Sequence, residues 1–312
     1  MYKYLHFDVF TDRPFEGNQL AVFPEPAGLT SSQMQAIAQE MAFSESTFIF
    51  PPERGGDARM RIFTPAEELP IAGHPTIGST FALAAEGVVA PGTDRFVFEL
   101  GVGPTPVSLE WNGGHLLFAW MTQPNPTFGG TVGDRRAIAS ALGVRETDLQ
   151  PDLPVQMVSC GVPFLFVPLQ TRAAVDAVSI DRKALTAATS SANLPETPVF
   201  IFTLAGEGTE STYSRMLAPG FGIAEDPATG SAAGPLGSYL VEHGAVSPQA
   251  GATLENRQGV AMRRPSRIHI SIEGRPGAIT RVRVGGKAVL VGRGELTAVP
   301  ASSAPLLATR EG

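Results

Sequence analysis

The residues best suited to chemistry lie at the starts of two apolar stretches that are bounded by glycines. In the second stretch, Asp226 stands before Pro227, which disfavours a helical conformation for the residue preceding it. Gly230 and Ser231 then open a run of small and apolar residues that ends at Gly244, as in a buried helix. The unpaired backbone N–H groups of a helix start can bind a carboxylate or a phosphate. This stretch therefore predicts an anion site beside an acidic side chain.

The first stretch has the same form and adds an imidazole. Gly73 and His74 open a small-residue run that ends at Gly87, and the helix dipole favours the neutral form of a histidine in the first turn. Glu45 lies in the connection between an expected helix and the expected strand 47–50. A carboxylate held there could move a proton on and off carbon, provided that burial raises its pKa toward neutrality. On spacing alone, a solvated loop glutamate remains the alternative.

The two stretches predict that the chain consists of two related halves. They have equal lengths, and each is followed by paired strands with a glycine turn, at 113–114 and at 285–286. Residues 122–130 have the composition of a linker, so we expect the boundary between the two halves there. The expected halves are 1–121 with a central helix 74–86, and 122–312 with a central helix 231–243. Short strands without regular βαβ repetition predict an α+β fold, with a mixed sheet around each helix, and not a Rossmann fold.

Composition and motifs exclude several classes of function. The net charge of −7 and the pI near 5.3 argue against nucleic acid as a partner. No stretch approaches the ~20 apolar residues of a membrane span. The single cysteine, Cys160, fits a reducing compartment, so a cytoplasmic location is expected. The five histidines lack metal-ligand spacing and no nucleotide-binding motif is present, so we expect neither a metal nor another cofactor.

Several segments together resemble the PhzF family, named for the isomerase of phenazine biosynthesis. The resemblance runs from residue 7 to about residue 296 and is carried by FDVFTDRPFEGNQLAVF, FSESTFIF, RIFTPAEELPIAGHPTIG, EDPATGSAAGPLGSYL, QGVAMRRPSRI and GGKAVLVGRGEL. It implies the diaminopimelate-epimerase-like fold, in which two pseudo-symmetric domains each wrap a mixed sheet around a central helix and the active site lies in the cleft between them. It also implies a homodimer.

The resemblance further implies the residues of the site. The family's namesake isomerises trans-2,3-dihydro-3-hydroxyanthranilate with a glutamate as base and acid, and that position is Glu45. Catalytic roles would extend to His74 and Asp226. Substrate-binding roles would belong to Asn18, Gly73, Gly230, Ser231 and Gln258. The chain departs from the family pattern at Gln19, where a proline is usual, and at Arg263, where a glycine is usual and substrate fit could change.

Three functions remain open at this point. The first is an isomerase of a small cyclic or unsaturated carboxylic acid that transfers a proton at Glu45. The second is a non-enzymatic small-molecule or protein-binding member of the same fold, since fold does not fix function. The third is a lyase that uses the same groups. A two-thiol racemase is not expected, because the positions of its cysteines are occupied by Ala72 and Thr229.

Overall fold

The chain separates into two compact units. The computed structural model describes residues 1–204, 207–208, 210–247 and 253–300. The first unit comprises residues 1–121 together with the segment that begins at Lys287, and the second comprises residues 122–286. No helix in these described ranges is long and apolar enough to cross a membrane.

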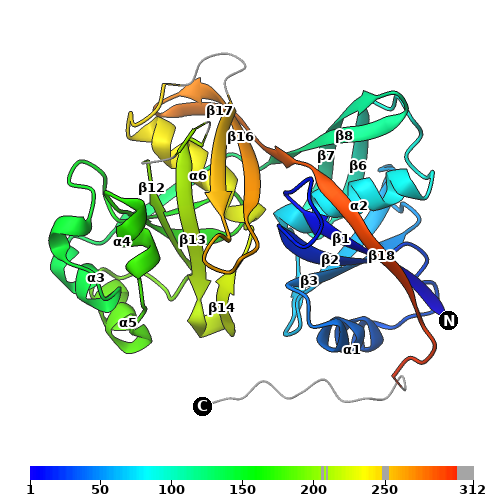
Figure 1. Cartoon of the computed structure of the whole chain (residues 1–312), viewed down its shortest axis with the longest axis horizontal. Helices are drawn as coiled ribbons and strands as arrows, with labels where there is room; N and C mark the ends of the chain where they lie inside the picture. The colour runs from blue at the N-terminus through cyan, green and yellow to red at the C-terminus, as the bar shows by residue number, and fades with distance from the viewer. Residues whose placement is uncertain (205–206, 209, 248–252, 301–312) are drawn as a thin grey trace. The chain divides into compact units, whose positions relative to one another are not determined.

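The first unit is a mixed sheet around helix α2, which spans Gly73–Ala85. The other helix is α1, Ser31–Met41. The strands are β1 Tyr2–Val9, β2 Asn18–Phe23, β3 Glu45–Phe50, β4 Ala58–Phe63, β5 Glu68–Leu69, β6 Arg95–Leu100, β7 Gly103–Asn112, β8 His115–Gln123, whose last two residues belong to the second unit, and β18 Ala288–Leu296. Figure 1 shows α2 in cyan beside β1 and α1 in blue below β3.

The side chains of β3 alternate between the two helices, as they must in a strand. Thr47 faces α2, since its hydroxyl lies 2.9 Å from the hydroxyl of Ser79. Phe48 faces the other way, into a cluster with Met34 and Ile37 of α1. Glu45 therefore shares the α2 face with Thr47. Helix α1 starts with the expected capping box at Thr30.

The second unit repeats this arrangement around helix α6, Gly230–Glu242. Its smaller helices are α3 Arg135–Ala141, α4 Arg172–Ala177 and α5 Arg182–Ser191, with 3₁₀ turns η1 Glu146–Asp148 and η2 Pro219–Phe221. Its strands are β9 Thr127–Thr131, β10 Gln156–Ser159, β11 Pro163–Pro168, β12 Val199–Thr203, β13 Thr212–Ala218, β14 Ile223–Asp226, β15 Thr253–Gln258, β16 Ser266–Arg275 and β17 Ala278–Gly286. Gly237 lets α6 lie against β16, because a Cβ there would come within 2.5 Å of Ile270.

Strand pairing shows that the two units are built alike. In the first unit β1 pairs with β2 antiparallel, β2 with β3 parallel, β3 with β4 antiparallel and β4 with β6 parallel. In the second, β10 pairs with β11, β11 with β12, β12 with β13 and β13 with β15 in the same four senses. The two central helices have 13 residues each and begin one residue earlier than expected, at Gly73 and Gly230. The duplication inferred from the glycine-bounded stretches is therefore present in the topology.

The end of the chain differs from the expected division. The predicted second half ran to residue 312, but the segment from Lys287 belongs to the first unit because β18 pairs with β1 along its length, from Tyr2↔Leu296 to Val9↔Ala288. The turn at 113–114 joins β7 to β8, as expected. The turn at 285–286 instead ends β17, after which the chain passes into β18. Residues 301–312 lie outside the described residues.

A buried carboxylate organises the loop between β3 and β4. Glu99, on β6, is 2% exposed and accepts hydrogen bonds from three backbone N–H groups of that loop, those of Glu53, Arg54 and Gly56. These bonds, that from Glu53 most of all, hold the pKa of the Glu99 carboxyl below its ordinary value.

Candidate active site

Glu45 is the first residue of β3 and not part of the preceding connection. It pairs with Leu20 at the start of the parallel strand β2. Its side chain is 15% exposed, so it is partly shielded but remains reachable. A carboxylate on a paired strand is held more precisely than one in a loop. The structure thus corrects the expected position of Glu45 and places it on a rigid element.

Glu45, His74 and Asn18 form a continuous polar chain in the first unit. Glu45 Oε2 lies 3.1 Å from His74 Nε2. On the other side of the ring, His74 Nδ1 lies 3.2 Å from Asn18 Nδ2. His74 and Asn18 are both almost fully buried. The spacing is within the reach that proton transfer requires. Three residues predicted separately from the sequence therefore meet at one place.

The imidazole of His74 is neutral. Burial lowers its pKa from the ordinary 6.5 to about 3, and a hydrogen bond with the backbone of Gln19 only partly opposes this. Nδ1 lies 3.2 Å from Asn18 Nδ2 and Nε2 lies 3.1 Å from Glu45 Oε2, although the contact between Nε2 and Oε2 does not have the geometry of a hydrogen bond. A neutral imidazole beside Glu45 brings no second charge into the site. His74 is therefore an uncharged, buried neighbour of the Glu45 carboxylate.

The backbone before Asn18 fixes where its amide lies. Gly17 has φ 67°, and a Cβ on it would lie 2.2 Å from the carbonyl oxygen of Val9. Only glycine fits that conformation and that contact. Asn18 then opens β2 opposite Val9. The departure at Gln19 leaves this turn intact, because Gln19 continues β2 as the partner of Asp8.

A second polar cluster surrounds the start of α6 in the second unit. Asp226 ends β14 and accepts a hydrogen bond from the hydroxyl of Thr229. The Gln258 side chain donates to the Asp226 carbonyl oxygen at 2.9 Å and to the Thr229 hydroxyl at 2.9 Å, and accepts from the Thr229 backbone N–H at 3.2 Å. All three residues are buried. Two predicted site residues, Asp226 and Gln258, are thus joined through Thr229.

Two members of this cluster were not predicted as site residues. Thr229 was named only as the residue at a racemase cysteine position, although a threonine just before a helix is a frequent capping residue and could have been singled out. Gln123 donates a hydrogen bond to the carbonyl oxygen of Gly230 at 3.0 Å. It comes from the linker, far away in sequence, so no local pattern could reveal it. Ser231 is partly exposed, whereas Gly73 and Gly230 are buried.

The two units differ at the position of the carboxylate. The strand equivalent to β3 is β12, and its first residue is Val199, which pairs with Leu165 as Glu45 pairs with Leu20. The second unit therefore has no carboxylate at this place. Cys160 does not substitute for one, because it is buried and desolvation raises the pKa of its thiol to about 12. Within the described residues, no three His, Cys, Asp or Glu side chains gather where they could hold a metal ion.

Paired units, each with a mixed sheet around a buried helix whose first turn carries polar groups, define the class of diaminopimelate-epimerase-like proteins. The fold agrees with that of a protein from Agrobacterium radiobacter titled a probable proline racemase, which is 12% identical with a TM-score of 0.64 and covers 95% of this chain and 93% of its own. Such low identity shows the fold alone.

The chain belongs to the phenazine biosynthesis-like protein family, PhzC-PhzF, whose model matches residues 7–294. It is 39% identical over 298 residues to the trans-2,3-dihydro-3-hydroxyanthranilate isomerase of Pseudomonas fluorescens, which covers 95% of this chain and 99% of the relative. A PhzF-family phenazine biosynthesis protein from Bacillus anthracis has a TM-score of 0.84 at 25% identity and covers 95% of this chain and 98% of its own. The resemblance read from the sequence segments is confirmed.

Proposed function

We propose that this protein is a cofactor-independent isomerase of a small cyclic or unsaturated carboxylic acid, with Glu45 as its proton-transferring group. The observation that carries the proposal is the contact of 3.1 Å between the Glu45 carboxylate and the buried, neutral His74. Isomerase names in the family and a relative that acts on trans-2,3-dihydro-3-hydroxyanthranilate support it. That compound is the first substrate to test.

In the proposed reaction Glu45 removes a proton from a carbon of the substrate. The electron pair of the broken C–H bond moves into the adjoining conjugated system, so that the double bond shifts. Glu45 then returns the proton to a different carbon, and no oxidant or reductant is consumed. His74, whose Nε2 lies 3.1 Å from Glu45 Oε2, stays uncharged beside the carboxylate during both steps. General acid–base catalysis of this kind contributes about 10²–10⁴-fold in rate.

The contrast between Glu45 and Val199 favours transfer by one base. A racemase that removes a proton from one face and returns it to the other needs a group on each side, whereas an isomerase can use one group for both steps. Only the strand of the first unit carries a carboxylate here. We assign Asp226, Thr229 and Gln258 to substrate binding, together with the backbone N–H groups at the starts of α2 and α6.

The names of the relatives give no support to a non-enzymatic binding protein or to a lyase. A cytoplasmic location is proposed from the buried, unpaired Cys160, which suits a reducing compartment. The homodimer implied by the family stays a prediction, which sedimentation analysis of the purified protein would test. Binding of nucleic acid is not expected at a net charge of −7.

The test is a proton NMR time course in deuterated water with trans-2,3-dihydro-3-hydroxyanthranilate. Wild type should introduce deuterium into the ring as the substrate signals shift. Glu45→Gln should lose about 10²–10⁴-fold in rate. The matched control is Glu40→Gln, the same change at an exposed position of α1, which should leave the rate unchanged. Undiminished turnover by Glu45→Gln would contradict the proposal.

A further inference from the structure

The turn between β15 and β16 holds an arginine in a backbone conformation that suits glycine. Arg263 has φ 58°, in the left-handed region. The Arg264 N–H bonds to the carbonyl of Gly259 at 3.0 Å, and the Arg263 N–H bonds to that of Val260 at 3.0 Å. This pair of hydrogen bonds is the Schellman motif, whose left-handed position is usually occupied by glycine. A non-glycine residue there is under strain, and strained residues concentrate at functional sites.

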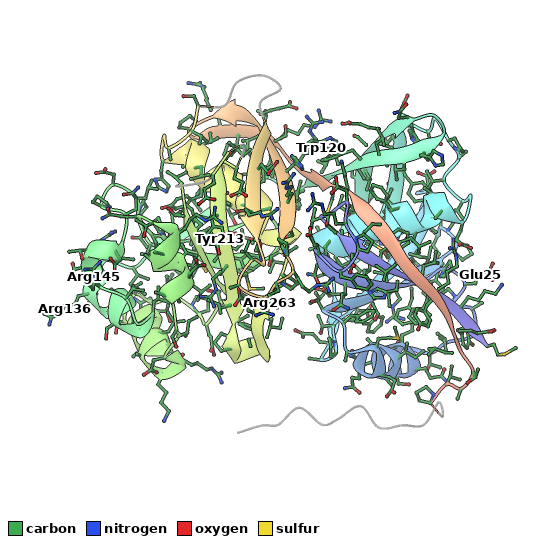
Figure 2. All side chains as sticks on the ribbon, in the orientation of Figure 1. Glu25, Trp120, Arg136, Arg145, Tyr213 and Arg263 are labelled. Carbon is green, nitrogen blue, oxygen red and sulfur yellow. The ribbon has the colours of Figure 1, made fainter. Side chains whose placement is uncertain are left out.

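The turn is fixed against the cluster that contains Asp226. The hydroxyl of Ser266 donates to the carbonyl oxygen of Pro227 at 2.8 Å and to that of Gln258 at 3.1 Å. Gly259, at φ 75°, lies so close to Pro227 that a Cβ would come within 2.5 Å of its carbonyl oxygen. Figure 2 shows Arg263 on this loop near β14, the strand that Asp226 ends. The arginine is therefore held beside the proposed substrate-binding cluster.

The guanidinium of Arg263 carries an uncompensated charge. The side chain is exposed, and no acidic side chain among the described residues pairs with it. Some other arginines of this unit are paired, for example Arg215 with Glu225 at 2.9 Å and Arg257 with Glu210 at 3.6 Å. A guanidinium binds a carboxylate with two parallel hydrogen bonds. The strained backbone, the position beside the Asp226 cluster and the unpaired charge of Arg263 all point to a carboxylate ligand.

We propose that Arg263 is a specificity-determining residue that pairs with a second carboxylate of the substrate, so that the preferred substrates are dicarboxylic acids. The inference rests on the proposed function and deepens it, because it adds a requirement on the substrate to the proton transfer at Glu45. A monocarboxylate would still bind at the start of α6 but would leave Arg263 without its partner.

The test measures binding of benzoate, phthalate, isophthalate and terephthalate by calorimetry. At least one dicarboxylate should bind wild type more tightly than benzoate does. Arg263→Gly should lower the affinity for that dicarboxylate by about tenfold, which is the effect of one charge-assisted contact. The affinity for benzoate should stay within about twofold of the wild-type value. Arg263→Lys should keep part of the preference. An unchanged ratio of dicarboxylate to benzoate affinity in Arg263→Gly would overturn the proposal, as would the absence of any dicarboxylate preference in wild type.

Two further measurements separate this role from a structural one and from the proposed reaction. Arg263→Gly should melt at the same or a higher temperature than wild type, since glycine relieves the strain, so weaker binding could not be ascribed to unfolding. Arg136→Gln on α3 removes the same charge at another exposed position of this unit and should leave both affinities unchanged. If the dicarboxylate preference fails while Glu45-dependent deuterium uptake persists, only the role of Arg263 falls. If uptake fails while the preference holds, only the isomerase reaction falls.

Discussion

Replacing His74 by glutamine should reduce the loss in the free energy of unfolding that occurs as the pH falls. Burial lowers the pKa of His74 from 6.5 in the unfolded chain to about 3 in the folded one. Between these two values the unfolded chain binds a proton that the folded chain does not, so the free energy of unfolding falls as the pH falls. From about pH 8 to about pH 5 this group alone removes about 2 kcal/mol. His74→Gln cannot titrate and should lack that loss.

The measurement is urea denaturation of wild type and His74→Gln at both pH values. The loss of stability on acidification should be smaller in the variant by about 2 kcal/mol, whatever its stability at neutral pH. Glu45→Gln is the companion variant, because it keeps His74 and changes the neighbouring carboxylate. Glu45→Gln should lose as much stability on acidification as wild type does. Parallel curves for wild type and His74→Gln would refute the assignment of a buried, neutral imidazole.

The remaining predictions concern two buried groups. Glu99→Gln should destabilise the protein at neutral pH, because an amide accepts the three loop N–H bonds less well than a carboxylate does. Since the folded pKa of Glu99 is lowered, the stability gap to wild type should narrow as the pH falls through that pKa, which denaturation at neutral and acid pH would check; a constant gap would contradict this account. Cys160→Ala should leave turnover unchanged, and N-ethylmaleimide should label native Cys160 far more slowly than the unfolded chain, as followed by mass spectrometry. Loss of turnover in Cys160→Ala would revive a thiol mechanism.

The local parts of this fold could be predicted from the sequence. The central helices were placed within one residue, because long runs of small apolar residues between glycines leave few alternatives. The capping box at Thr30 correctly marked the start of α1. The meeting of Glu45 and His74 could be anticipated only through the family resemblance. Their separation along the chain gives no periodic signal, and the sheet brings them together.

What the sequence could not show depends on pairing between distant segments. A glycine pair at 285–286 indicates a tight turn, but whether β18 returns to β17 or leaves for β1 depends on the exposed edge of β1. The hydrogen bond from Gln123 to the start of α6 likewise joins segments that are far apart in the sequence. Strand β3 begins as early as Glu45 because this residue pairs with β2. Arg263 could be noted as an unusual residue, but its left-handed backbone is visible only in the structure.

The pairing of β18 with β1 has a consequence for how the chain is made. During synthesis β1 emerges before the whole second unit, whereas the strand that covers one of its edges emerges after it. The second unit is continuous and can fold as soon as residues 122–286 have left the ribosome, whereas the first unit waits with an open strand edge until β18 has emerged. The N-terminal unit is thus completed last, and a ribosome that stalls before β18 releases a chain whose second unit is whole and whose first unit still exposes β1.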